Sequence, residues 1–307
     1  MLGRGWRVIA WALVGVGLSA GAVLHAAPVR VVATTTIVGD VVAAVGGQAI
    51  DLRVLLPRGA DPHTFQATPR DLVLLSTAGV VFLNGAGLET VLYPLLDTTA
   101  SDAVALSAGM TLRRLGDQER DDHGEDEGDW DPHVWLDPTL VMIWTERIAD
   151  ALAERDPANA VGYAARADTY RTALADLDLW IWRQLGGLPS ERRQLVTDHA
   201  SLGYFAARYG FTEIGAILPG FSTLAEPSAR ELAALEDRIR ELGVTALFVE
   251  ASAHPTLARQ IADDTGVGVV RLFLGSLSAP NGPAASYLDL MRYNVTRIVD
   301  ELGATEE

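Results

Sequence analysis

Short runs of aliphatic and β-branched residues alternate with amphipathic segments along most of the chain. The apolar runs predict strands at residues 30–35, 51–55 and 80–83, and a second series at 194–197, 212–217, 246–249 and 269–272. Apolar residues at helical spacing predict helices at 38–45, 70–76, 139–154, 202–209, 228–242, 255–264 and 286–302. Alternation of this kind is typical of βα units and mostly parallel sheets. The pattern therefore predicts an α/β protein with two lobes.

The segment between the two series has the pattern of one long helix. Residues 158–185 contain no Pro and a single Gly, and a helix of these 28 residues is about 42 Å long. That length suits a rigid linking helix across two lobes, whereas an ordinary surface helix belonging to one lobe is the alternative. We expect an N-terminal lobe at 28–157, a linking helix at 158–186 and a C-terminal lobe at 187–307.

The first 27 residues have the pattern of an export signal. Arg4 and Arg7 precede an apolar run at residues 8–24, which three glycines interrupt and small residues follow. We expect cleavage near Ala26 or Ala27 and a periplasmic mature protein. A membrane anchor is the alternative, but seventeen residues with three glycines are at the lower limit for a bilayer core of about 30 Å.

Composition narrows the possible partners. All 24 basic residues are Arg, and the chain has 40 Asp and Glu residues, so the net charge is −16. This charge argues against nucleic acid or an anionic membrane as a binding partner and favours a small cation. The absence of Cys excludes disulfides, a thiolate zinc site and a cysteine nucleophile. It also excludes a lipid on an N-terminal Cys, so we expect a freely diffusing monomer with no lipid anchor.

The acidic charge is concentrated in residues 117–131. This segment contains nine acids, one Arg and His123, and it has almost nothing to bury, which predicts a mobile loop. A solvated linker is one interpretation, and a weak collector of cations is the other. If the segment collects cations, deletion of residues 117–129 slows metal loading and leaves a tight site intact.

Three histidines occur where a ligand site is expected. His63 and His199 each follow a predicted strand, one in each lobe, and His133 precedes the helix at 139–154. Ligands of open α/β sheets bind beyond the carboxyl ends of the strands. Three imidazoles converging on a cleft suit Zn²⁺, and they suit Mn²⁺ less well because Mn²⁺ prefers oxygen. The sequence therefore predicts a zinc site between the lobes.

Around these histidines the sequence resembles a known family. The strings are GADPHTFQATPRDL, DPHVWLDP and TDHASLGYFAARYG, flanked by FLNGAGLE, EPSARELAAL, LFVE and SYLDLMRYNV. They are similar to motifs of the zinc and manganese substrate-binding proteins of ABC importers (cluster A-I), in the same order over essentially the whole mature chain. The resemblance implies two α/β lobes joined by a rigid helix, His63, His133 and His199 as metal ligands, and delivery to a membrane permease. His at the third position is typical of zinc-type members, where manganese-type members usually have Glu.

The fourth ligand of the family is missing from this chain. Many members have an Asp in a string like LYSDSLS, and this sequence has Gly275 at that position. Three replacements for this ligand are possible: a water molecule, Glu250, or a group of the acidic segment, which is either His123 or a carboxylate. Asp198, Asp61 and Asp137 are possible partners of the histidine rings.

Other functions fit the same residues. A manganese-type carrier of the same family is the nearest alternative. Three His ligands with an open position also occur in zinc hydrolases, but the sequence lacks an HExxH helix and a GxSxG turn. An exported metal buffer is a third class. We expect a zinc carrier and no enzyme, with an ABC permease as its partner and a metallochaperone as a further candidate.

Overall fold

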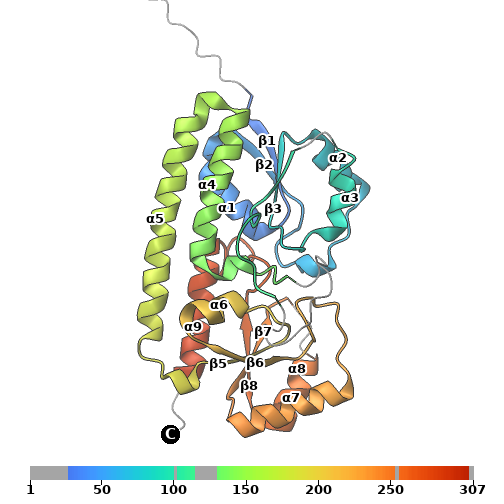
Figure 1. Ribbon diagram of the computed structural model, residues 1–307, viewed down its shortest axis with the longest axis vertical. Coiled ribbons are helices and arrows are strands. Elements are labelled where there is room, and N and C mark those ends of the chain that lie inside the picture. Colours follow the sequence, from blue (N-terminus) through green and yellow to red (C-terminus); the bar gives the residue numbers. More distant parts are fainter. Residues whose placement is uncertain (1–26, 100–101, 115–129, 253–255, 304–307) are drawn as a thin grey trace, which may run out of the picture.

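The computed structural model describes residues 27–99, 102–114, 130–252 and 256–303. Two lobes, each with a four-stranded parallel sheet, lie one above the other, and a long helix runs beside both (Figure 1). The predicted α/β class with two lobes and a linking helix is confirmed.

The sheet of the N-terminal lobe has the strand order β2-β1-β3-β4, with every neighbouring pair parallel. The strands are β1 (Val29–Ala33), β2 (Ile50–Val54), β3 (Val80–Leu83) and β4 (Asp102–Ala105). The apolar runs of the sequence predict the first three strands but not β4. This edge strand has only four residues, half of them exposed, and so it lacks the apolar run by which a buried strand is found.

Helices cover both faces of this sheet. They are α1 (Thr36–Gly46), α2 (Pro69–Thr77), α3 (Tyr93–Leu96) and α4 (Pro138–Arg155). Most of α1 is buried, and its start is capped by the Thr35 hydroxyl, which accepts the Val38 N–H. Among the described residues of this half, the 3₁₀ turns are η1 (Gly47–Ala49), η2 (Pro62–Thr64), η3 (Thr90–Leu92) and η5 (Val134–Leu136).

The C-terminal lobe repeats the plan with the strand order β6-β5-β7-β8, again all parallel. Its strands are β5 (Gln194–Thr197), β6 (Thr212–Ala216), β7 (Ala246–Glu250) and β8 (Gly268–Leu272). Its helices are α6 (Gly203–Tyr209), α7 (Ala229–Leu242) and α8 (Thr256–Thr265). The start predicted for α7 is confirmed, because Ser228 and Glu231 form a reciprocal capping box.

Helix α5 (Ala160–Leu185) is a single helix of 26 residues, with η6 (Pro157–Asn159) before it and η7 (Ser190–Arg192) after it. In the N-terminal lobe, Arg166 donates to the carbonyls of Val45 and Gly46. In the C-terminal lobe, Asp178 accepts both guanidinium N–H groups of Arg208. The helix therefore contacts both lobes, as the linking-helix prediction requires.

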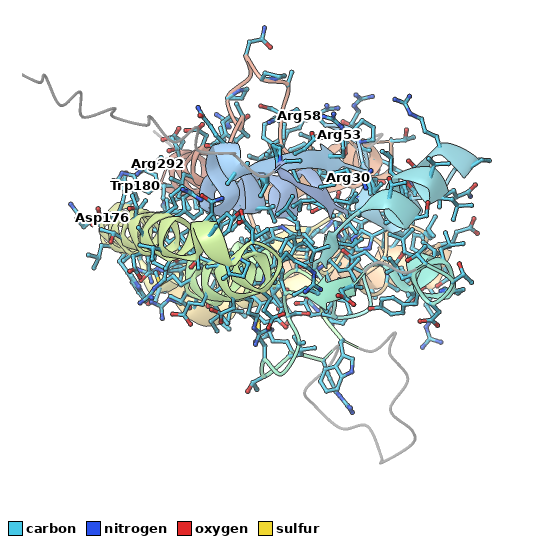
Figure 2. All side chains as sticks on the ribbon, turned by 90° about the horizontal axis from the view of Figure 1, so that it is seen from above. Arg30, Arg53, Arg58, Asp176, Trp180 and Arg292 are labelled. Atoms are coloured by element: carbon cyan, nitrogen blue, oxygen red, sulfur yellow. The ribbon has the colours of Figure 1, made fainter. Side chains whose placement is uncertain are left out.

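The last helix, α9 (Tyr287–Gly303), packs against α5. The Arg292 guanidinium lies 5.2 Å from the centre of the Trp180 ring, and Figure 2 shows the two side chains at the same edge of the molecule. Trp180 belongs to α5, so this contact joins the two helices that run beside the lobes.

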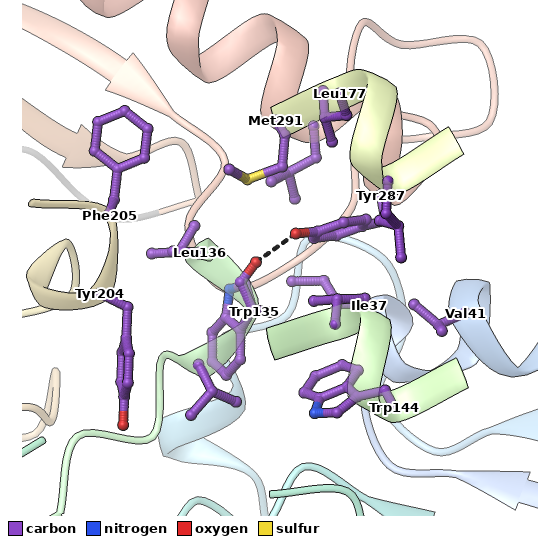
Figure 3. Packing of buried hydrophobic residues seen from close by; sticks show 14 of the residues in the cluster. Ile37, Val41, Trp135, Leu136, Trp144, Leu177, Tyr204, Phe205, Tyr287 and Met291 are labelled. Carbon is purple, nitrogen blue, oxygen red and sulfur yellow. Dashed lines mark hydrogen bonds between the residues drawn. The ribbon is translucent and has the colours of Figure 1, made fainter. Parts of the chain in front are cut away.

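One continuous hydrophobic core connects the lobes. It contains side chains from both sheets and from α1, α4, α5, α6 and α9, and smaller clusters lie on the outer side of each lobe. At its centre the Tyr287 hydroxyl donates to the Trp135 carbonyl at 2.7 Å, next to Ile37 and Trp144 (Figure 3). Wide separation of the lobes would expose this core to water, so large opening motions are unfavourable.

Several predictions lie outside the described residues. They concern the export signal up to residue 26, the acidic residues 117–129 with His123, and residue 255, where one of the predicted helices begins. Asp131 is described and is only 1% exposed, so the prediction that the exposed acidic segment extends to Asp131 is wrong. None of the described helices is both long and apolar enough to cross a membrane.

Candidate metal centre

His63 lies in the turn η2 beyond the carboxyl end of β2. The Asp61 side chain begins this turn by accepting the backbone N–H of His63 at 2.9 Å. The other carboxylate oxygen of Asp61 accepts the hydroxyl of Thr223, which belongs to the C-terminal lobe, at 2.5 Å. The loop that presents His63 is therefore tied to both lobes.

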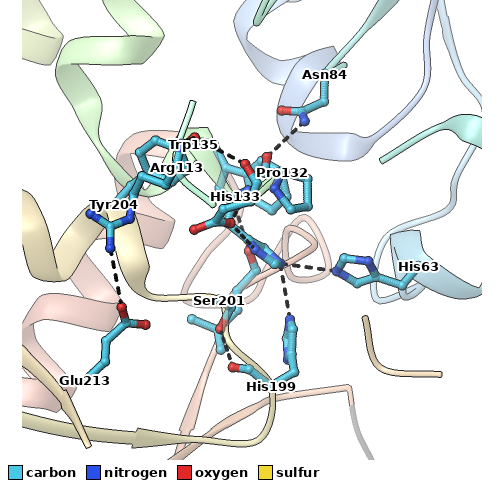
Figure 4. A network of polar contacts seen from close by, with 12 residues as sticks. His63, Asn84, Arg113, Pro132, His133, Trp135, His199, Ser201, Tyr204 and Glu213 are labelled. Atoms are coloured by element: carbon cyan, nitrogen blue, oxygen red, sulfur yellow. Dashed lines mark hydrogen bonds and ion pairs between the residues drawn. The ribbon is translucent and has the colours of Figure 1, made fainter. Parts of the chain in front are cut away.

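His133 lies in front of η5 and is held by Asp131. One carboxylate oxygen of Asp131 faces both the backbone N–H of His133, at 2.9 Å, and the ring Nδ1, at 2.8 Å. The Asn84 amide fixes the same loop by donating to the Pro132 carbonyl at 2.9 Å (Figure 4). Both contacts determine the direction of the imidazole ring.

His199 follows β5 and is held in the same way by Asp198. The Asp198 carboxylate faces the backbone N–H and the ring Nδ1 of His199, both at 2.9 Å. Its second oxygen accepts the Glu250 backbone N–H at 2.8 Å, so Asp198 also connects β5 to β7.

The structure brings the three predicted histidines together. The Nε2 of His133 lies 3.2 Å from the Nε2 of His63 and 3.2 Å from that of His199 (Figure 4). Zn–N bonds of about 2.0–2.1 Å in a tetrahedral arrangement separate two nitrogens by about 3.3 Å. Among the described residues, these three form the only group of His, Cys, Asp or Glu close enough to hold a metal ion. The spacing of the nitrogens therefore fits a zinc-sized cation.

The hydrogen bonds fix which ring nitrogen can bind a cation. Nδ1 of His133 and of His199 faces a carboxylate, so a neutral ring carries its proton on Nδ1 and directs the lone pair of Nε2 into the site. Opposed lone pairs in a buried site repel each other unless a proton or a metal cation lies between them. His133 and His199 are 1% and 3% exposed, whereas His63 is half-buried, so His63 is the most accessible of the three rings.

Burial sets the charge of the rings. It lowers the pKa of His63 to about 3 and that of His133 well below its usual value, and the neighbouring imidazoles add to both effects. Burial also opposes protonation of His199, but the hydrogen bond and the charge of Asp198 outweigh it and raise the pKa of His199. Desolvation raises the pKa of Asp131 to about 7. His199 is thus the ring on which a proton competes with a cation.

Glu250 lies next to Asp198, the support of His199, and its carboxylate is already engaged. One oxygen accepts the backbone N–H of Leu274 at 2.8 Å and of Gly275 at 2.7 Å, and the other accepts the Ser252 N–H at 3.2 Å. Burial raises the pKa of this carboxyl. At Gly275, an added Cβ would lie 2.9 Å from Pro62 Cδ, so a side chain at this position would displace the residue next to His63.

The remaining carboxylates have other contacts than those expected. Asp61 bonds to the His63 backbone, and Asp137 caps α4 by accepting the Thr139 N–H. Sequence reasoning missed Asp131 as the partner of the His133 ring. The available signal was the repeated string DPH, which occurs at residues 61–63 and 131–133 and places an Asp two residues before each histidine.

A comparison with known proteins agrees with this geometry. Residues 31–301 match the family described as "Zinc-uptake complex component A periplasmic". The chain belongs to this family. It is therefore a metal-binding, extracytoplasmic substrate-binding component of an ABC importer, and the expectation of a carrier and not an enzyme is confirmed.

Relatives of the chain differ in the metals for which they are named. It is 30% identical to the manganese-binding lipoprotein MntA of Halalkalibacterium halodurans over 275 residues, 89% of this chain and 88% of that protein. It is also 30% identical to the iron-binding protein YfeA of Yersinia pestis over 278 residues, 89% and 86% of the two chains. The structure of the periplasmic zinc-binding protein TroA from Treponema pallidum superposes with a TM-score of 0.81 at 28% identity, covering 90% and 99%. Membership of the family thus establishes that the chain binds a metal, but it does not identify the metal.

Proposed function

We propose that this protein binds one Zn²⁺ between its lobes and delivers it to an ABC permease in the membrane. The observation that carries the proposal is the convergence of three Nε2 atoms, from His63, His133 and His199, at spacings of 3.2 Å about His133. The two most buried rings have Nδ1 on a carboxylate, which is how metal-bound histidines are usually held.

The chemistry of the donors favours zinc over manganese. Imidazole nitrogen suits Zn²⁺, whereas Mn²⁺ binds best to carboxylate, carbonyl and water oxygen. The described ligand group contains only nitrogen donors, because Gly275 offers no side chain and the Glu250 carboxylate is bound to backbone N–H groups. A manganese carrier is the second candidate, and the similarity to a protein named for manganese binding favours it.

We propose water as the fourth ligand. Moving Glu250 into the site would leave the buried N–H groups of Leu274 and Gly275 without their acceptor, which costs about 1–3 kcal/mol for each group. A water needs no such rearrangement and can be displaced during transfer. Replacement by His123 or another group of the acidic segment remains an expectation about residues outside the described ranges.

For the location, we propose a periplasmic monomer freed from its export signal near Ala26 or Ala27. The relative MntA is named a lipoprotein, while the 307 residues of this chain contain no Cys to which a lipid could be attached. The expectation of a carrier without a lipid anchor rests on that absence. The permease is the partner proposed for metal transfer, and a metallochaperone is a further candidate.

Titration with competing chelators tests the proposal. The mature protein is expected to bind one Zn²⁺ per chain tightly and Mn²⁺ much more weakly. His63→Ala, His133→Ala and His199→Ala are each expected to lower zinc affinity by more than about 100-fold, beyond the 10–100-fold typical of outer-sphere changes. Tighter binding of Mn²⁺ than of Zn²⁺ would support the manganese alternative, and unchanged zinc binding in all three variants would reject the site.

A further inference from the structure

The segment between β8 and α9 crosses from the C-terminal lobe onto the N-terminal lobe. We call residues 273–286 the crossover strap. The hydroxyl of Ser276 accepts the Gly59 N–H at 2.9 Å, the Leu277 N–H donates to the Thr36 hydroxyl at 2.9 Å, and Arg58 donates to the Ser278 carbonyl at 2.7 Å. The strap therefore ties the C-terminal lobe to the N-terminal lobe by hydrogen bonds, in addition to the linking helix α5.

The first residues of the strap contact the loops of two histidines. The Leu274 carbonyl accepts the indole N–H of Trp135, two residues after His133, at 2.7 Å. Gly275 lies against the ring of Pro62, the residue before His63, so closely that an added Cβ would be 2.9 Å from Pro62 Cδ. A displacement of Leu274 and Gly275 would thus move the supports of both loops.

Glu250 connects this part of the strap to the third histidine. Its side chain accepts the backbone N–H groups of Leu274 and Gly275, and its own backbone N–H donates to Asp198. Asp198 in turn holds the Nδ1 of His199. One residue at the end of β7 therefore lies between the support of His199 and the strap that contacts the other two loops.

We propose that Glu250 is a positioning residue for the cation site, which acts by holding the strap and not by binding the cation. The inference rests on the proposed function of the three histidines. Glu250 is 5% exposed, and its carboxylate accepts three backbone N–H groups. Its rotation toward the histidines would leave these buried donors unpaired. The role depends on the place of its oxygen atoms and not on their charge.

Comparison of E250Q with E250D tests this role. Gln keeps one oxygen at the same distance from the chain, and this oxygen can still accept the N–H groups of Leu274 and Gly275. Its NH2 group replaces only the oxygen that accepts the longer bond from Ser252, at 3.2 Å, so E250Q is expected to retain zinc affinity within about threefold. Asp keeps the charge but withdraws the oxygens by one methylene. E250D is expected to lose about 10–100-fold in zinc affinity, as other changes in the supports of metal ligands do.

The visible absorption of bound Co²⁺ gives a readout that a purely structural role would not change, because it reports the geometry of the ligands. The spectrum of E250Q is expected to match that of the unchanged protein, and that of E250D is expected to differ. E250D binding zinc as well as or better than E250Q would overturn the proposal, whether both variants bind normally or both bind weakly. His133→Ala in the same titration distinguishes failure of the Glu250 role from failure of the proposed function. If this variant binds zinc normally, the proposed function itself fails.

Discussion

The Nε2 atoms of His133 and His199 lie 3.2 Å apart in a buried site, and the Nδ1 of each ring faces a carboxylate. The carboxylates are Asp131 and Asp198, each within two residues of the ring that it orients. Two lone pairs directed at each other are unfavourable without a proton or a metal cation between them. The fold thus holds these ligands near the spacing that a bound metal requires, and little rearrangement is needed on binding.

Replacement of Asp131 by Asn tests the support of the His133 ring. Asn can accept the Nδ1–H but brings no negative charge, so D131N is expected to weaken zinc binding about 10–100-fold in a chelator competition. D137N is the matched control. Asp137 caps α4 and lies 3.9 Å from the Arg208 guanidinium, but it has no hydrogen bond to a histidine ring, and Asn is an equally good cap. Equal losses in the two variants would contradict a specific role for Asp131.

Zinc affinity is expected to fall as the pH decreases through the raised pKa of His199. A proton on this ring competes with the metal, while His63 and His133 stay neutral because burial lowers their pKa values. The dissociation constant should therefore rise about tenfold per pH unit below that pKa, the slope for one proton. D198N removes the partner that raises the pKa, so the fall should begin at a lower pH. A slope for three protons would be inconsistent with the lowered pKa values of the other two rings.

The contact between Thr223 and Asp61 is a direct hydrogen bond between the lobes, at 2.5 Å. Both residues line a cavity of about 300 Å³ next to Asp198 and Glu250. Without the hydroxyl, T223V is expected to release zinc about tenfold faster, since a hydrogen bond to a charged group contributes about 1.5 kcal/mol or more. Stopped-flow transfer to a chelator measures this rate.

T64V is the matched control for that experiment. Thr64 lines the same cavity, but its hydroxyl donates to the Asp61 carbonyl within the N-terminal lobe. Its zinc release rate should stay close to that of the unchanged protein. If T64V accelerates release as much as T223V, the effect belongs to the cavity surface and not to the bond between the lobes.

Stability should respond to residues far from the metal centre without any change in zinc binding. Ser228 caps α7 through a reciprocal capping box with Glu231, so S228A is expected to lower the free energy of unfolding by about 1 kcal/mol. S76A is the control, because the Ser76 hydroxyl only donates to the Val73 carbonyl within α2 and its loss should leave the free energy of unfolding nearly unchanged. Urea titrations monitored by Trp fluorescence compare the two variants. An unchanged midpoint for S228A would mean that the start of α7 contributes nothing to the lobe.

The sequence was sufficient for the elements whose apolar pattern is strong. Buried strands such as β3 and the long helix α5 follow directly from runs and periodicity, because burial on both faces or along one stripe requires them. Strand β4 could not be found in this way, since half of its four residues are exposed and its pairing with β3 depends on contacts distant in the chain.

The histidines could be predicted because each stands at the end of an element, where parallel sheets place ligands. The role of Asp131 could not be read from the same pattern. In the sequence, Asp131 is the last residue of an acidic segment whose composition is typical of a solvent-exposed loop. Only the folded chain shows that this carboxylate is buried against His133. The contacts of Glu250 also needed the fold, because its partners Leu274 and Gly275 lie more than twenty residues away.

A crystal structure of the mature protein, equilibrated with equal amounts of Zn²⁺ and Mn²⁺, tests the central claim most directly. Anomalous scattering at the two absorption edges identifies the bound metal and its position. The expected result is a zinc peak within about 2.0–2.1 Å of Nε2 of His63, His133 and His199, with no manganese peak. A manganese peak at the three histidines, or a metal held elsewhere, would contradict the account.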